Sequence, residues 1–247
     1  MLHLYKVPGF YVAGFFGSFG SGKSLALAEH AIDLSNYFQR PIVTNMVMDI
    51  RAAKRYARKY KLTYFARFGR IRHYPDIEDL LAAENSVIIL DEAGIDLFAR
   101  NFKDKSRKTL LDALFRIRHY NNYLLYASQG KEQIDKQLRE RSQIFCYCKG
   151  TQVYRPRLRR SNLLMRSQYY LDPHRFQFFE ESGASKFFYP IWASGFRFGI
   201  RVCGLREKML FACYNSHDRR RSSRPMTFCE YPDPSFLHRF ETTVDKS

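Results

Sequence analysis

The chain has 247 residues, enough to bury one sizeable core, and its 45% hydrophobic and 16% aromatic content excludes an intrinsically disordered protein. No apolar run is long enough to cross a bilayer as a helix, and the five cysteines lack the paired spacing of a zinc site or a disulfide framework. Cys146 and Cys148 lie in an apolar strand-like run, and we expect them to be buried thiols. The formal net charge of +17 favours a polyanionic partner, either nucleic acid or an anionic membrane; a basic protein without such a partner is the alternative.

A phosphate-binding motif lies near the start of the chain. Gly17-Ser-Phe-Gly-Ser-Gly-Lys-Ser24 fits the pattern G-x-x-x-x-G-K-[ST], between a predicted buried strand at 11–16 and a helical pattern at 25–38. Its glycines allow backbone N–H groups to turn toward phosphate oxygens, Lys23 is expected to reach the β- and γ-phosphates, and Ser24 to bind Mg²⁺. A chance glycine-rich turn is the alternative. The predicted nucleotide-binding residues are Gly17, Ser18, Phe19, Gly20, Ser21, Gly22, Lys23, Ser24 and Leu25.

Two acidic residues follow a second buried strand. After a short strand at 41–45, a basic helix at 51–61 and a helical piece at 77–84, four aliphatic residues at 87–90 end in Asp91 and Glu92. A wholly apolar short run indicates a strand covered on both faces, whose carboxyl end is where α/β sheets bind ligands. We expect Asp91 to hold Mg²⁺ through water and Glu92 to orient or deprotonate the attacking water. A strand end capped by ordinary surface acids is the alternative.

The next elements complete an α/β pattern. An amphipathic helix is predicted at 105–120, a buried strand at 123–128, a helix at 134–141 and a strand at 143–147. Gln129 follows the strand at 123–128 and is either a γ-phosphate sensor or a turn residue. The order predicts a P-loop NTPase core in residues 1–150, with a mainly parallel central sheet flanked by helices.

Beyond residue 150 the pattern becomes β-rich. Short β-type segments at 163–171, 176–180, 186–193 and 196–203 predict a small extension, residues 151–218, packed on the core. Residues 219–247 are predicted to form a basic, loosely ordered tail. Arginine clusters at 155–160 and 219–224 suit phosphates or lipid headgroups, or solvated surface loops.

Several motifs together resemble one family. They are Gly20-Ser-Gly-Lys-Ser24, Thr44-Asn45, Leu90-Asp-Glu-Ala-Gly94, Asn101 to Arg107, Leu110 to Arg116 with Arg118, the strand ending in Gln129, Ile134 to Arg139 and Tyr214 to Asp218. Their order is similar to that in the zonular occludens toxin (Zot)-like proteins, which include the assembly ATPases of filamentous phages. The phosphate loop alone is generic, whereas the run from Asp91 to Arg139 is specific.

The resemblance implies a HerA/FtsK-type P-loop ATPase that forms a ring such as a hexamer and drives assembly and export of single-stranded viral DNA. It implies ATP and Mg²⁺ as cofactors, a viral coat or membrane assembly protein as partner, and a place in the host cytoplasm, with peripheral contact at the inner face of the host membrane. By position in the family's motifs, the resemblance implies that Lys23 binds the nucleotide and that Ser24 binds the metal. It implies that Asp91 holds the metal, that Glu92 acts on the attacking water, and that Gln129 senses the γ-phosphate. Arginines supplied across a subunit boundary stabilise transition-state charge in such rings, and the candidates are Arg118, Arg139 and Arg141.

Filamentous-phage members usually continue into a transmembrane helix and an outer domain, and this sequence has neither, so tethering is expected from a partner or from the basic surface. The missing span favours an alternative function, a soluble translocase or helicase that packages a viral genome into a preformed capsid. A small-molecule kinase is a further alternative, disfavoured because the adjacent Asp91 and Glu92 suit water attack, which a kinase must exclude. A non-catalytic nucleotide-controlled scaffold is disfavoured by the intact motifs.

Overall fold

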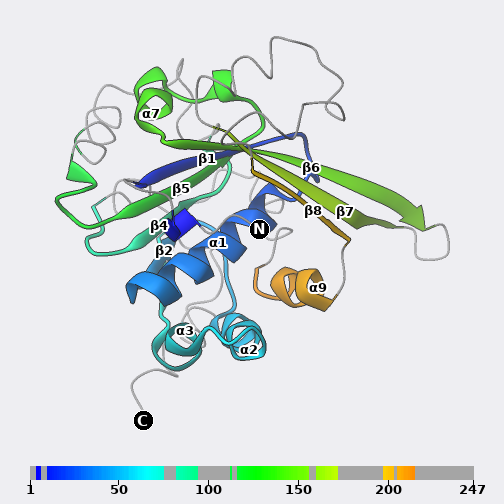
Figure 1. Ribbon diagram of the computed structural model, residues 1–247, viewed down its shortest axis with the longest axis horizontal. Coiled ribbons are helices and arrows are strands. Elements are labelled where there is room, and N and C mark those ends of the chain that lie inside the picture. The colour runs from blue at the N-terminus through cyan, green and yellow to red at the C-terminus, as the bar shows by residue number, and fades with distance from the viewer. Residues whose placement is uncertain are drawn as a thin grey trace, which may run out of the picture.

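A computed structural model of the chain describes residues 4–6, 10–74, 82–93, 112, 116–155, 160–171, 197–202 and 205–214. Within this part an eight-stranded sheet separates two groups of helices (Figure 1). One face of the sheet carries α1 (Lys23–Phe38), with α2 (Ile50–Lys59), α3 (Thr63–Phe68) and α9 (Leu205–Phe211) outside it. The other face carries α7 (Lys136–Arg141). The predicted α/β class is therefore confirmed.

Six neighbouring strands are parallel and two are antiparallel. The sheet order is β3-β2-β4-β5-β1-β6-β7-β8, with parallel pairing from β3 to β6 and antiparallel pairing of β6 with β7 and of β7 with β8. The strands are β1 (Val12–Phe16), β2 (Ile42–Thr44), β3 (Ile71–His73), β4 (Val87–Leu90), β5 (Tyr123–Ser128), β6 (Ile144–Arg155), β7 (Arg160–Leu171) and β8 (Arg197–Val202). Strand β5 lies between β1 and β4, so three carboxyl ends meet at one edge of the sheet.

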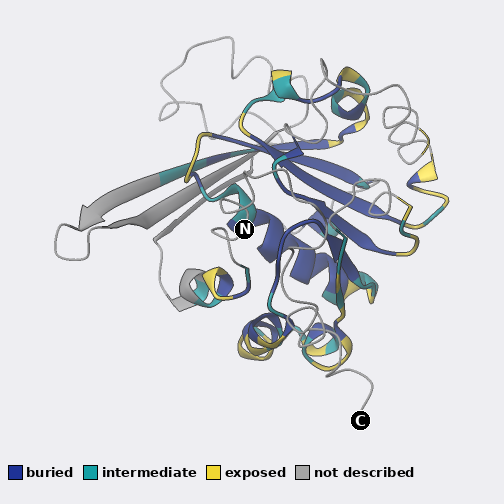
Figure 2. Cartoon of the chain, turned by 180° about the vertical axis from the view of Figure 1, so that it is seen from behind, coloured by how far each residue is buried: buried dark blue, intermediate teal, exposed yellow. Residues whose placement is uncertain are grey.

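The central strands are covered on both faces, as their apolar runs predicted. Ala13 and Phe15 of β1 belong to the core on the α1 side, whereas Val12 and Phe16 belong to the core that includes Ile134 and Leu138 beside α7. Figure 2 shows the central strands as a band of buried residues, with most exposed positions on the outer helices and loops. Because successive side chains of a strand point to opposite faces, such double burial requires apolar residues at every position.

Helix α1, predicted from its helical pattern, is buried on all sides over most of its length. Every residue from 25 to 35 is buried, including Glu29, because α2, α3 and α9 cover the side that faces away from the sheet. Arg206 of α9 forms a 2.7 Å ion pair with Glu29, and its guanidinium lies 4.7 Å from the centre of the Tyr60 ring. The Asp49 N–H also donates to the carbonyl of Cys213, 2.7 Å away. The chain thus returns from β8 to pack against the first helix of the core.

Several elements differ from the sequence predictions. The six-residue helix α3 and the three-residue edge strand β3 were not predicted, because neither is long enough to show a periodic pattern. Helix α9 was also not predicted. Strand β6 runs through residue 150, the predicted end of the core, so the division of the chain at that residue remains a prediction.

Much of the predicted helix at 105–120, the strands at 176–180 and 186–193, the arginine cluster at 219–224 and the tail lie outside the described residues. The described cysteines Cys146, Cys148 and Cys213 are buried thiols, which was expected for Cys146 and Cys148. None of the described helices combines the length and apolarity that crossing a membrane requires.

Two helices begin at aspartate caps. The Asp49 carboxylate accepts hydrogen bonds from the N–H groups of Arg51 and Ala52, 2.7 and 3.1 Å away, and fixes the start of α2. Asp135 accepts from the Gln137 N–H at 2.8 Å and starts α7. Each cap satisfies backbone donors that have no partner within the helix, which is why the helices begin at these residues.

Candidate functional site

The phosphate-binding motif forms a tight loop between β1 and α1. Gly17, Gly20 and Gly22 have φ angles of 151°, 71° and 88°, a region that residues with a Cβ rarely adopt. A Cβ on Gly17 would lie 2.2 Å from the carbonyl oxygen of Cys148 on the neighbouring strand β6, so no larger residue fits there. The loop therefore needs glycine both for its turn and for its close packing on β6.

Lys23 folds back over this loop at the start of α1. Its Nζ donates to the carbonyl oxygens of Gly17 and Ser18, at 2.8 and 2.9 Å. Burial lowers the pKa of Lys23, whereas the nearby Cys148, Asp91 and Glu92 oppose that shift. The ammonium group is thus a partly desolvated cation inside a loop of backbone dipoles, the arrangement that suits an anionic ligand.

The two predicted motifs meet at the carboxyl edge of the sheet. The Ser24 hydroxyl donates to Oδ2 of Asp91 at 2.9 Å. This contact forms although β5 lies between β1, which leads into the loop, and β4, which leads to Asp91. Asp91 is buried, and its Oδ1 accepts from the N–H of Glu92 at 3.1 Å. A hydroxyl and a carboxylate in contact form an oxygen donor set that suits Mg²⁺, which is bound by one or two protein groups together with waters and phosphates. The residues present therefore fit the metal that the sequence predicts.

Glu92 follows Asp91 in an unusual backbone conformation. Its φ is 52°, in the left-handed region that non-glycine residues rarely adopt, and its side chain is partly exposed. Such strain is often found at functional sites, where the surrounding structure holds it. The turn after β4 thus directs Asp91 inward against Ser24 and leaves Glu92 in contact with solvent at the same edge.

Asn45 is part of this site but was not predicted as a functional residue. It follows β2, and its amide group pairs with the backbone of Asp91: Nδ2 donates to the Asp91 carbonyl at 3.1 Å, and Oδ1 accepts from the Asp91 N–H at 2.9 Å. The carbonyl of Asn45 lies 3.2 Å from Nε2 of His73. Asn45 is therefore a positioning residue, and the available sequence signal was the Thr44-Asn45 motif at the end of the predicted strand.

Gln129 lies directly after β5, which pairs with both β1 and β4. A γ-phosphate sensor would have to lie between the phosphate loop after β1 and the acidic residues after β4. Gln129 is exposed. The preceding Ser128 is buried, and its hydroxyl donates to the carbonyl of Gly130 and to Oε1 of Gln133, both at 3.0 Å. These hydrogen bonds stabilise the turn after β5. The structure thus places Gln129 at the same sheet edge as the loop.

Of the three predicted arginines, Arg118 lies apart from the phosphate loop of its own chain. Arg118 stacks 4.9 Å from the ring of Tyr11, which precedes β1 and so lies at the opposite edge of the sheet from the loop. Arg139 pairs with Glu132 at 3.3 Å, and Arg141 is exposed at the end of α7. A role for any of them in a neighbouring copy's site remains a prediction.

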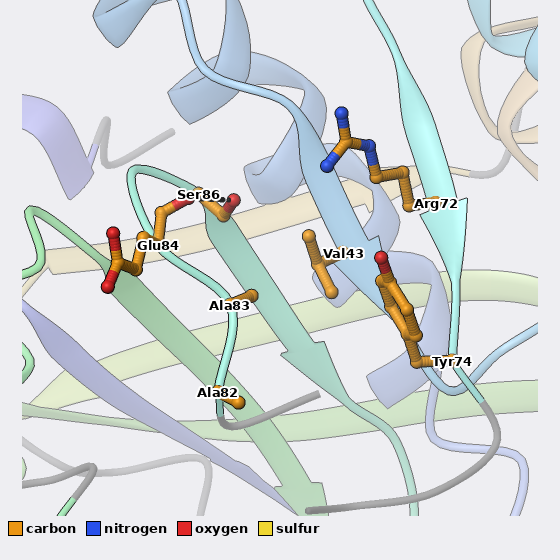
Figure 3. Close-up of a pocket in the computed structure, with 7 residues that line it drawn as sticks. All are labelled: Val43, Arg72, Tyr74, Ala82, Ala83, Glu84 and Ser86. Carbon is orange, nitrogen blue, oxygen red and sulfur yellow. Dashed lines mark hydrogen bonds between the residues drawn. The ribbon is translucent and has the colours of Figure 1, made fainter. Parts of the chain in front are cut away.

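A hollow of about 350 Å³ lies at the β3 side of the sheet (Figure 3). Its lining comes from β2, from β3 and the residue after it, and from the segment that enters β4, and consists of Val43, Arg72, Tyr74, Ala82, Ala83, Glu84 and Ser86. It contains none of the residues predicted to bind nucleotide or metal, so we give it no part in this site.

Sequence comparison supports one family. Residues 12–155 match the model of the family described as zonular occludens toxin (Zot). A "Gene 1 protein" of Enterobacteria phage I2-2 is 29% identical over 134 residues, a match that covers 50% of this chain and 36% of the phage protein. The match thus spans little more than a third of that relative's length.

Solved structures are also similar to this chain. The N-terminal domain of zonular occludens toxin from Neisseria meningitidis aligns with a TM-score of 0.44 and 16% identity, covering 83% of this chain and 99% of that domain. The genome packaging NTPase B204 from Sulfolobus turreted icosahedral virus 2, in complex with ATP-gammaS, aligns with a TM-score of 0.42 and 11% identity, covering 68% of this chain and 95% of that protein.

Proposed function

The chain belongs to the zonular occludens toxin (Zot) family, and on that basis we propose that it is a Mg²⁺-dependent ATP hydrolase that acts on viral DNA during phage assembly. The observation that carries the proposal is the 2.9 Å contact between Ser24 and Asp91, which joins the phosphate loop to the acidic strand end. Phosphate-binding loops occur in many proteins, but hydrolysis also requires a group that acts on water beside the metal position.

In the proposed reaction, the N–H groups of the loop and the Lys23 ammonium bind the phosphates of ATP. Lys23 exchanges its bonds to the Gly17 and Ser18 carbonyls for bonds to phosphate oxygens. Ser24 and Asp91 hold Mg²⁺, directly or through water, and Asn45 keeps the Asp91 backbone in place. Bound Mg²⁺ supplies a positive charge that neutralises the oxygens of the transferred phosphoryl group.

Glu92 is the proposed group that orients the attacking water and accepts its proton. It lies next to Asp91, partly exposed, in a turn whose conformation is held by the hydrogen bond between its own N–H and Asp91. Gln129, exposed at the end of the adjacent strand, is the proposed sensor of the γ-phosphate. These roles depend on the meeting of three strand ends at one edge, which the sheet order supports.

The proposal also covers the process that ATP hydrolysis drives. Family membership and the relative from phage I2-2 support assembly or packaging of a phage genome, and the net charge of +17 suits a DNA partner. We propose that the DNA is single-stranded and that the chain works as a ring, in which Arg118, Arg139 or Arg141 of one copy reaches the nucleotide of the next. In this proposal a viral coat or membrane protein recruits the ring.

Two variants test the chemistry of the site. Lys23→Ala is expected to abolish nucleotide binding, whereas Glu92→Gln is expected to keep binding and to lose hydrolysis by at least about 100-fold, because removal of a general base typically costs 10²- to 10⁴-fold. Binding is measured by calorimetry with a non-hydrolysable ATP analogue and turnover by phosphate release, with and without single-stranded DNA. Lys136→Ala, an exposed change on α7, is the control.

Unchanged turnover in Glu92→Gln would assign the water-activating role to another residue. If Lys23→Ala binds the ATP analogue as tightly as wild type, the nucleotide does not bind at this loop. Electron microscopy of the wild-type chain with ATP and DNA tests the ring, and only monomers under these conditions would contradict it. Co-purification with a capsid-vertex protein instead of a coat or membrane protein would favour packaging over export.

A further inference from the structure

The segment from α2 to β3 carries positive charge without any acidic residue. Residues 50–74 contain nine Lys and Arg and no Asp or Glu, whereas the whole chain has 41 against 24. Seven of these cations lie on α2 and α3 or within two residues of the end of α3, and together they form what we call the α2–α3 basic surface: Arg51, Lys54, Arg55, Arg58, Lys59, Arg67 and Arg70. The excess of positive charge is therefore concentrated in this segment.

The cations of α2 follow one side of the helix. Arg51, Arg55 and Arg58 are exposed, whereas Ala53 and Tyr56 on the opposite side are buried in the core. Four residues of helix advance by about 6 Å, so these guanidinium groups form a row along the helix rather than a single point of charge. Figure 2 shows α2 and α3 side by side at the outside of the molecule, with exposed positions on their outer sides.

The cations of the two helices also crowd one another. The Nζ of Lys54 donates to the carbonyl of Arg67 at 3.3 Å, which brings α2 and α3 together at this point. Burial lowers the pKa of Lys54, and the nearby charges of Arg58 and Arg70 lower it further. Like charges held this close repel one another, and an anion placed between them relieves that repulsion.

An aromatic ring lies beside these cations. The Phe68 side chain, at the end of α3, is 61% exposed, and its ring centre lies 5.7 Å from that of Tyr64. Tyr64 is itself fixed by a hydrogen bond from its hydroxyl to the carbonyl of Gln39 at 3.0 Å. A large exposed ring held by a second ring, next to Arg67, forms a platform on which a flat group can stack.

We propose that the α2–α3 basic surface binds a single strand of nucleic acid, with its phosphates along the α2 row and an unpaired base on Phe68. A row of cations next to an exposed aromatic ring is the combination by which proteins bind single strands without sequence preference. An anionic bilayer presents its charges over a plane instead of along a line, and it offers no base for Phe68. The inference rests on the proposed function only in taking the polyanion to be DNA; the surface is separate from the nucleotide site.

The test is binding of a fluorescein-labelled 30-nucleotide oligo(dT) to the full chain, measured by anisotropy over a range of salt concentrations. Arg55→Glu with Arg58→Glu is expected to weaken binding at least about tenfold and to reduce the salt slope by about 1.4, because each phosphate contact on a single strand contributes about 0.7. Phe68→Ala is expected to weaken binding at least about fivefold without changing the salt slope. Arg116→Glu with Lys136→Glu makes the same charge change on exposed residues elsewhere and is expected to have less than half of the effect.

Several outcomes would overturn the inference. It fails if wild-type protein does not bind the oligonucleotide, if both double variants weaken binding equally, or if Phe68→Ala binds normally. It also fails if the Arg55 and Arg58 variant loses binding to phosphatidylserine-containing vesicles but keeps oligonucleotide binding, which would make the surface a lipid site. ATP turnover without DNA is expected to stay at the wild-type level in all these variants, so loss of DNA binding is distinguishable from failure of the nucleotide site.

Discussion

Loss of Arg206 is expected to release α9 from the core, because its guanidinium pairs with a carboxylate that has no solvent contact. In Arg206→Met, Glu29 loses the cation that lies 2.7 Å from its Oε1, and Glu29 is 0% exposed while the Arg206 side chain is 26% exposed. Burial acts to lower the pKa of Arg206, but the charge of Glu29 and the other neighbours of Arg206 outweigh burial and raise the pKa.

Removing one partner of a buried pair typically costs about 3–5 kcal/mol, because the other charge stays buried. The contact of Arg206 with the Tyr60 ring, 4.7 Å from its centre, adds about 0.5–1 kcal/mol at a partly exposed site. Since the guanidinium is one-quarter exposed, we take the lower end and expect a loss of about 3–4 kcal/mol in the free energy of unfolding. That is a large part of the about 5–15 kcal/mol of a typical domain.

Urea unfolding followed by circular dichroism measures this loss, and Arg139→Met provides the matched control. The Arg139 side chain is also 26% exposed, but its partner Glu132 is 75% exposed, so we expect a loss below about 1 kcal/mol. The comparison isolates burial of the carboxylate, since the arginines are equally exposed.

A double-mutant cycle completes the test. In Glu29→Gln with Arg206→Met, the combined loss is expected to fall short of the sum of the single losses by more than about 1 kcal/mol, because the residues are in contact. The reasoning is refuted if Arg206→Met costs less than about 1 kcal/mol or if the two changes are additive within about 0.5 kcal/mol. In that case the return of the chain onto α1 depends on apolar contacts such as those of Leu210.

Three further predictions concern the site. Gly17→Ala is expected to abolish ATP-analogue binding and to cost about 1–3 kcal/mol of stability, because its Cβ collides with the Cys148 carbonyl; Gly130→Ala, whose Cβ has no heavy atom within 4 Å, is expected to match wild type in calorimetry and urea unfolding. Asn45→Ala leaves the buried backbone N–H and carbonyl of Asp91 without their side-chain partner, so we expect a loss of about 1–3 kcal/mol and a higher Mg²⁺ concentration for half-maximal phosphate release; an unchanged Mg²⁺ dependence would contradict its positioning role. The pKa of Lys23 is lowered by burial, so its ammonium loses its proton below the usual pKa of 10.5. ATP-analogue affinity is therefore expected to fall as the pH rises through that window, less so in Lys23→Arg, which stays charged. Folded Lys23 binds fewer protons there than unfolded Lys23, so the same pH rise adds to the stability of the ligand-free chain; equal affinity profiles in both proteins would refute this assignment.

The sequence determined the parts of this protein that depend on neighbouring residues. The eight residues from Gly17 to Ser24 specify a tight glycine turn before a helix, and the apolar run before Asp91 specifies a strand buried on both faces. Spacing along the chain suffices for these features, because the glycine conformations and the alternation of strand side chains are local properties. The parallel sheet and the family therefore followed from the sequence.

The tertiary structure alone decided which distant residues meet. The insertion of β5 between β1 and β4, the bonds of Asn45 to the backbone of Asp91, and the distance of Arg118 from the phosphate loop all depend on strand order. The burial of Glu29 was likewise not evident from the sequence, since a carboxylate in a helix is expected to face water. Only the fold shows that α9 places Arg206 beside it. Pairing between segments far apart in the chain leaves no periodic trace in either segment, and for that reason only the folded chain reveals it.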